Sequence, residues 1–75
     1  LLKIPSFQIN AYAIFRYEDN LKVPIWYCFN YNEAVGFAHE DSKETEGKYK
    51  HYSIEGIGCC ATRVVAMFTT TFSIQ

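Results

Sequence analysis

Two runs of alternating apolar and polar residues in the first half of the chain constrain the fold more than any other feature. They cover residues 7–17 and 21–31, and the sequence Glu18-Asp19-Asn20 separates them. Because successive side chains of a strand point to opposite faces, this period of two indicates half-buried strands, and the polar residues between them are typical of a turn. We therefore predict a β-hairpin with long arms. Its expected core-facing positions are Phe7, Ile9, Ala11, Ala13, Phe15 and Tyr17 in the first arm and Leu21, Val23, Ile25, Tyr27, Phe29 and Tyr31 in the second.

Pro24 interrupts the second arm of this hairpin. Proline has no N–H to donate to a sheet ladder, so we expect the arm to be an edge strand there or to carry a bulge. A short helix is predicted over residues 32–38, with Asn32 as its N-cap and with Gly36 limiting it to one or two turns. The mostly charged segment 39–48 predicts a solvated loop.

The last third of the chain predicts two more strands. Residues 49–55 alternate again, Gly56-Ile57-Gly58 predicts a turn, and residues 62–74 are rich in β-branched and aromatic side chains. In this final strand the expected inward positions are Val64, Ala66, Phe68, Thr70, Phe72 and Ile74. The predicted fold class is α+β: a mainly antiparallel β-sheet of four to five strands with at most one short helix, in a single domain over residues 1–75.

The composition excludes several classes of protein. With 49% hydrophobic and 17% aromatic residues and a net charge of -1, the chain is not disordered, low-complexity or collagen-like. Its longest uninterrupted apolar runs are far shorter than the roughly 20 residues that a bilayer requires, so we expect no membrane span. The seven basic residues are scattered among eight acidic ones, so any RNA contact would depend on aromatic stacking and a few ionic groups rather than on a basic stripe.

The chain has three cysteines, Cys28, Cys59 and Cys60, and they support two interpretations. Adjacent cysteines seldom bond each other, so a disulfide would join Cys28 to Cys59 or Cys60 and add about 3 kcal/mol to the stability of the fold. One thiol would then be left for an intermolecular bridge. Alternatively, all three are reduced and buried. Small size favours the disulfide and a secreted protein. The missing initiator methionine leads us to expect a processed product or a trimmed chain.

No metal or other cofactor is expected. His39, His51 and the adjacent cysteine pair match no zinc-ligand spacing. The sequence Gly56-x-Gly58 lacks the third glycine and the lysine of a phosphate-binding loop.

The pattern Tyr49-x-His51-x-x-x-Glu55, with Arg63 further on, is the best candidate for a site. On a strand, positions 49, 51 and 55 share one face, and His51 and Glu55 lie roughly 13 Å apart, so they could bracket a small substrate. If the register places Arg63 opposite Glu55, all four groups line one face. The alternatives are an exposed ion pair between Glu55 and Arg63 and an amphipathic strand that shows its polar side.

Several segments together resemble the middle of the guanyl-specific fungal ribonucleases. They are residues 33–41 (EAVGFAHED), Thr45-x-Gly47, residues 49–52 (YKHY), Glu55-Gly56-Ile57 and residues 61–65 (ATRVV). In that family a helix ends in an Ala-Gly-aromatic run, an acidic loop follows, and a Tyr-Pro-His-x-Tyr strand leads to Glu-Gly-Phe. The scaffold is similar to that of secreted fungal effectors that keep the ribonuclease fold without catalysis.

The resemblance implies roles for four residues. Tyr49 and His51 would orient and activate the ribose 2′-hydroxyl, Glu55 would hold the guanine edge, and Arg63 would stabilise charge on the phosphorane. The chain departs from the family pattern, because Lys50 replaces a proline, the strand with the catalytic glutamate is missing, and no histidine follows His51. Without the general acid, the rate would fall by roughly two to four orders of magnitude.

Our first functional hypothesis is therefore a small secreted effector- or toxin-like protein with a ribonuclease-like scaffold. It would bind a protein partner or RNA through its aromatic residues without turning over a substrate. The second hypothesis is a minimal guanyl-type ribonuclease with His51 and Glu55 as the acid–base pair. The third is one processed subunit of a disulfide-linked secreted toxin heterodimer, and a fourth is a designed or selected sequence without biological activity.

Overall fold

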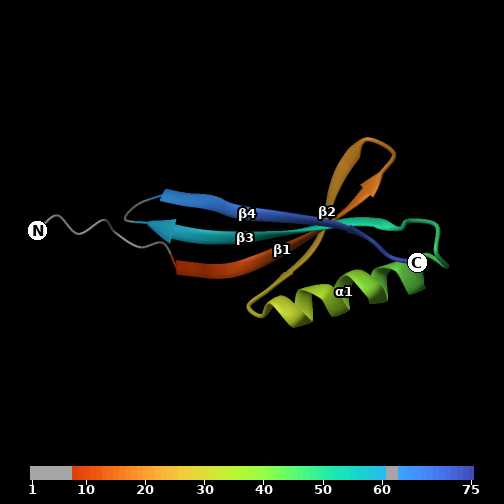
Figure 1. The fold of residues 1–75 in the computed structure, drawn as a ribbon, viewed down its shortest axis with the longest axis horizontal. Helices are drawn as coiled ribbons and strands as arrows, with labels where there is room; N and C mark the ends of the chain where they lie inside the picture. Colours follow the sequence, from red (N-terminus) through yellow and green to blue (C-terminus); the bar gives the residue numbers. More distant parts are fainter. Residues whose placement is uncertain (1–7, 61–62) are drawn as a thin grey trace, which may run out of the picture.

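The fold is one antiparallel sheet with a helix packed across one of its faces (Figure 1). The computed structural model describes residues 8–60 and 63–75. The elements in this part of the chain are β1 (Gln8–Glu18), β2 (Leu21–Cys28), α1 (Tyr31–Glu44), β3 (His51–Cys60) and β4 (Arg63–Ser73). The sheet has four strands in the order β2-β1-β3-β4, and every neighbouring pair is antiparallel. The predicted α+β class with a mainly antiparallel sheet is confirmed.

The predicted hairpin is confirmed as β1 and β2, joined at Asp19 and Asn20. Both expectations for Pro24 also hold, because β2 is an edge strand and its register with β1 shifts at this point. Pro24 lies opposite Phe15 while Trp26 lies opposite Ile14, which leaves one extra residue in β2 between them. Such a bulge accommodates the missing proline N–H without loss of the hairpin.

The prediction that the odd-numbered residues of β1 face the core is wrong. The helix covers the opposite face, where Ile14 is fully buried and Tyr12 packs against the core. The bulge then reverses the alternation in β2, so that Cys28 is buried while Tyr27 is 65% exposed. A shift of one residue exchanges the two faces of a strand, and the apolar residues on both faces of β1 left the choice to the helix. Among the predicted core residues, Phe7 lies outside the described residues.

Helix α1 is twice as long as the predicted one, and it replaces most of the predicted loop at 39–48. Its N-cap is Asn30, not Asn32, and the Asn30 Oδ1 accepts the Glu33 N–H at 3.2 Å. Gly36 lies within the helix and does not end it. The buried side chains recur every fourth residue and are small: Ala34, Ala38 and Ser42. Small side chains on one face allow the helix backbone to approach the sheet closely.

The helix ends where two residues adopt the left-handed conformation, Glu46 at φ 55° and Gly47 at φ 75°. The Glu46 N–H donates to the Lys43 carbonyl at 3.0 Å, and the Gly47 N–H donates to the Ser42 carbonyl at 2.8 Å. This is the Schellman arrangement, which satisfies the last carbonyl groups of a helix. The glycine associated with the end of the helix is therefore Gly47, and the prediction that Gly36 limits the helix is wrong.

The predicted turn at Gly56-Ile57-Gly58 is wrong, because β3 continues through it. Gly56 lies opposite Phe68 of β4, and a Cβ at Gly56 would overlap the Phe68 ring. The ring also packs edge-on to Tyr12, at 6.3 Å between centroids. The absence of a side chain at Gly56 thus leaves the space that the Phe68 ring of the neighbouring strand occupies.

The final strand is confirmed as β4, although only part of its predicted inward face is covered. Phe72 and Ile74 pack against the core, whereas residues 66–71 are exposed. The side chain of Val64 lies outside the described residues. No helix in the described part of the chain is long and apolar enough to cross a bilayer.

Two alanine substitutions at glycines should have opposite effects on stability. Gly56→Ala displaces the Phe68 ring and should lower the free energy of unfolding by roughly 1–3 kcal/mol. Gly36→Ala meets no atom within 4 Å in the middle of α1 and should raise it by roughly 0.4–1 kcal/mol. Urea unfolding followed by circular dichroism measures both values. A Gly56→Ala protein as stable as the wild type would contradict the close packing of the Phe68 ring on Gly56.

Candidate functional site

Two of the four residues predicted to form a site lie in one pocket. Tyr49 and His51 line a cavity of about 420 Å³ between residues 48–51 and the β1–β2 turn. The Arg16 guanidinium lies 4.8 Å from the centroid of the Tyr49 ring. The His51 Nδ1 is 2.9 Å from the Ser73 Oγ of the neighbouring strand.

The other two predicted residues lie elsewhere. Thr69, not Arg63, is opposite Glu55, and the Glu55 carboxylate forms an ion pair with Lys22 of β2. Arg63 pairs with Cys60 at the far end of β3, nine residues and roughly 30 Å from His51. The side chain of Arg63 lies outside the described residues. The structure therefore brings Tyr49 and His51 together and leaves Glu55 and Arg63 apart from them.

Cys28 is a buried free thiol, and its Sγ donates to the Asn30 carbonyl at 3.2 Å. Strand β1 lies between Cys28 in β2 and Cys59 or Cys60 in β3. Two strand spacings amount to roughly 10 Å, and a disulfide requires Cα atoms within about 7 Å. The predicted disulfide from Cys28 to Cys59 or Cys60 is therefore wrong. The side chains of Cys59 and Cys60 lie outside the described residues.

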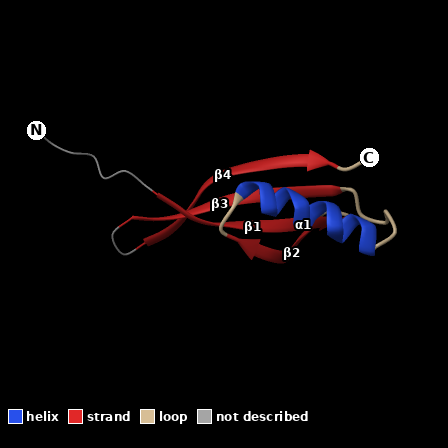
Figure 2. Cartoon of the chain, turned by 90° about the horizontal axis from the view of Figure 1, so that it is seen from below, coloured by secondary structure: helices blue, strands red, loops and turns tan. Residues whose placement is uncertain are grey.

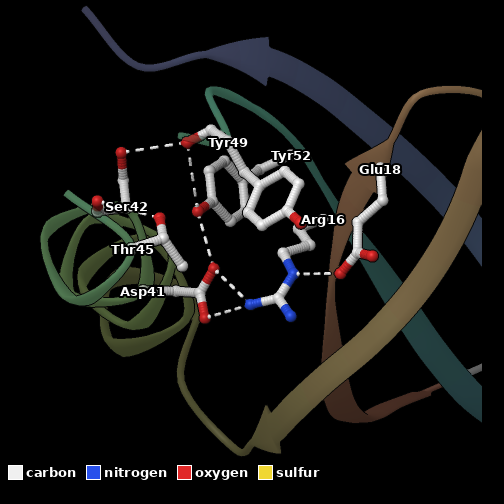
Figure 3. A network of polar contacts seen from close by, with 7 residues as sticks. All are labelled: Arg16, Glu18, Asp41, Ser42, Thr45, Tyr49 and Tyr52. Carbon is white, nitrogen blue, oxygen red and sulfur yellow. Dashed lines mark hydrogen bonds and ion pairs between the residues drawn. The ribbon is translucent and has the colours of Figure 1, made fainter. Parts of the chain in front are cut away.

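A polar network fastens the C-terminal half of α1 to the sheet (Figure 3). Arg16 of β1 donates to both carboxylate oxygens of Asp41 in α1, at 2.9 and 3.1 Å, and also to Glu18 at 2.8 Å. The Tyr52 hydroxyl of β3 donates to Asp41 at 2.7 Å. Asp41 thus joins α1 to two strands with three hydrogen bonds, two of them from the same arginine nitrogen, Nη1, to its two carboxylate oxygens.

The network raises the pKa of two of its proton donors, Tyr52 and Arg16. Burial raises the pKa of the Tyr52 hydroxyl, and the hydrogen bond to the Asp41 carboxylate raises it further. The hydrogen bond to Glu18, followed by the bond and the charge of Asp41, raises the pKa of Arg16. Groups that keep their protons this strongly are suited to fixing the position of the helix. They are poorly suited to proton transfer near neutral pH.

A second pocket, of about 300 Å³, lies between β2 and α1. Its apolar part is Ile25 and Trp26 of β2 with Phe37 of α1, and the Trp26 and Phe37 rings are 5.9 Å apart between centroids. Trp26 is 59% exposed and Phe37 is 38% exposed. Its acidic part is Glu40 and Glu44, one turn apart on α1, together with Asp41, which is already engaged by Arg16. We define these residues, without Asp41, as the aromatic–acidic pocket.

The two glutamates of this pocket are in an electrostatically unfavourable position. They lie in the C-terminal half of α1, where the helix dipole is negative and acidic side chains lower the stability of a helix. Among the cationic side chains that the structure describes, which do not include Arg63, none forms an ion pair with Glu40 or Glu44. Two exposed carboxylates beside exposed aromatic rings form a site that attracts cations.

The sequence-based predictions missed this pocket because they placed Glu40 and Glu44 in a loop. They also assigned no role to Trp26, which was not among the predicted core-facing residues. The signal was present in the spacing of Phe37, Glu40 and Glu44. Positions i, i+3 and i+7 share one face only if the segment is helical. Within the described residues, no group of three or more histidine, cysteine or acidic side chains is placed to hold a metal.

Comparisons of this chain with protein-family models, with curated proteins and with solved structures found no match.

The buried Tyr52 hydroxyl predicts a specific loss of stability in alkali. An unfolded tyrosine ionises near pH 10, whereas folded Tyr52 keeps its proton to a higher pH, so its stabilising contribution is complete below pH 10 and is lost as the pH rises above it. Between pH 9 and pH 11, the free energy of unfolding of the wild type should therefore fall by about 1 kcal/mol more than that of Tyr52→Phe. Urea unfolding at each pH measures the difference.

The matched control for this experiment is Tyr27→Phe, on the exposed edge strand. It should follow the wild-type dependence on pH. Parallel curves for the wild type and Tyr52→Phe would contradict a proton held by burial and by Asp41.

Proposed function

We propose that this protein is a non-catalytic binding module that takes an arginine or lysine side chain of a protein partner into the aromatic–acidic pocket. One observation carries the proposal: Trp26 and Phe37 are exposed side by side, and Glu40 and Glu44 lie beside them without an ion-pair partner among the described residues. Exposed aromatic side chains are enriched at the centres of protein interfaces.

The geometry favours a planar cation. An arginine guanidinium stacks on an aromatic face and donates bidentate hydrogen bonds to a carboxylate, whereas a lysine ammonium acts as a compact point charge. Trp26 supplies the strongest aromatic face for such a contact, and Glu40 and Glu44 supply two acceptors one helical turn apart. Arginine should therefore bind more tightly than lysine.

A protein partner fits this surface better than RNA. Two carboxylates at the rim of the pocket repel phosphate groups, and nucleic-acid binding depends on cations that neutralise phosphates. The aromatic surface continues along the chain to Tyr27 and Phe29, whose rings are 6.5 Å apart and whose side chains are 65% and 76% exposed. An exposed apolar patch with a charged rim is typical of a site that binds proteins.

Secretion, effector or toxin action and a ribonuclease-like scaffold stay predictions from the sequence. The proposed binding requires none of them. The pocket that carries it contains neither Tyr49, His51, Glu55 nor Arg63.

Trp26 is the single tryptophan of the chain, so its fluorescence reports on the pocket directly. The probe is the peptide acetyl-Gly-Gly-Arg-Gly-Gly-amide, with citrulline in place of arginine in the control peptide. We expect a saturable change in fluorescence with a dissociation constant of about 1 mM for arginine, weaker binding at high salt, and no saturation for citrulline.

The variants distinguish the pocket from general charge. Glu40→Gln combined with Glu44→Gln should weaken arginine binding by about five- to tenfold, since each exposed ion pair contributes about 0.2–1 kcal/mol. Glu33→Gln combined with Glu46→Gln removes the same charge from exposed positions outside the pocket and should leave binding unchanged. Equal responses to both peptides, or equal losses in both double variants, would refute the proposal.

A further inference from the structure

β4 forms one outer edge of the sheet, and β2 forms the other. β4 pairs with β3 on one side, and in the described part of the chain no element lies on its other side. The helix contacts β1, β2 and β3, and β4 runs along the margin that α1 leaves uncovered (Figure 2). The outward N–H and C=O groups of an edge strand are a template for another strand.

The sequence of β4 lacks the charged residues and the proline that block such an edge in many proteins. Its register with β3 shifts once, at Met67, and residues 68–73 then pair regularly with β3. Residues 64–75 contain no charged residue, no proline and no glycine, and they include Thr69, Thr70 and Thr71 at the centre of the strand. The side chains of residues 66–71 are all exposed. An uncharged segment rich in β-branched and aromatic residues has a strong tendency to pair with another strand.

The opposite edge, β2, is blocked by contrast. β2 is short and carries Pro24, and a proline on an edge strand is one of the features that prevent the addition of another strand. Lys22 adds a charge near the turn. Pairing through β4 therefore ends with one partner and does not propagate into a fibre.

We propose that β4 pairs with the β4 strand of a second copy of this chain, so that two four-stranded sheets join into one continuous antiparallel sheet. Antiparallel pairing of identical strands is two-fold symmetric, so each residue meets the same set of neighbours from both sides. Self-pairing of a charged strand would bring like charges together, and β4 has none after Arg63 at its end. Threonine pairs across strands are favourable, and the three central threonines supply them.

The dimension of the edge predicts the strength of this dimer. An 11-residue strand is roughly 36 Å long, and a sheet is about 10 Å thick, so two copies would cover roughly 700 Å² in total. Stable complexes bury about 1,200 Å² or more. The dimer should accordingly be weak and should depend on protein concentration.

Sedimentation velocity between 5 and 500 μM tests the proposal. The wild type should shift from monomer to dimer over this range. Thr70→Lys places two lysines close to the two-fold axis and should raise the dissociation constant at least about tenfold. Leu21→Lys adds the same charge at an exposed position of β2 and should change it less than about twofold.

Hydrogen exchange locates the interface independently of these variants. Amides of β4 should become more protected as the concentration rises, while those of β2 should not change. Circular dichroism of Thr70→Lys establishes that a loss of dimer is not a loss of fold. A wild type that stays monomeric up to 500 μM, a dimer protected at β2 instead of β4, or open-ended growth beyond the dimer would each overturn the proposal.

Discussion

The position of α1 on the sheet is the constraint on which the rest of the structure depends. Along most of the helix, small buried side chains bring the backbone close to the strands, and near its end Asp41 receives hydrogen bonds from Arg16 and Tyr52. The apolar contact is not directional, because any amphipathic helix could slide along a flat sheet. Asp41 supplies the direction, since charge-assisted bonds from two different strands fix both the rotation and the register of the helix.

The aromatic–acidic pocket follows from this placement. With Asp41 held against β1, the same face of the helix carries Phe37 toward Trp26, and Glu40 and Glu44 come to the edge of β2. None of these four residues is needed to bury the core. They are exposed aromatic groups and acids in an unfavourable part of a helix, a combination that stability alone does not select.

The two edges of the sheet differ in a way that fits separate roles. β2 carries a proline, a bulge and exposed aromatic side chains, so its surface suits side-chain recognition rather than backbone pairing. β4 has no charge after Arg63, pairs regularly with β3 over residues 68–73 and is exposed along residues 66–71, so its backbone groups are the feature it offers to a partner. A binding surface at one edge and self-pairing at the other could operate together without competing for the same residues.

Local patterns in the sequence determined the strands, the β1–β2 hairpin and the irregularity at Pro24, because strand period, turn chemistry and the missing proline N–H act over a few residues. The tertiary structure decided which face of each strand is buried, since β1 is apolar on both sides and only the docked helix distinguishes them. It also decided the length of the helix, because burial of Ala38 and the bonds to Asp41 outweigh the local cost of Gly36. For the same reason the aromatic–acidic pocket was invisible in the sequence: its residues come from β2 and α1, and only the packing between these elements makes them neighbours.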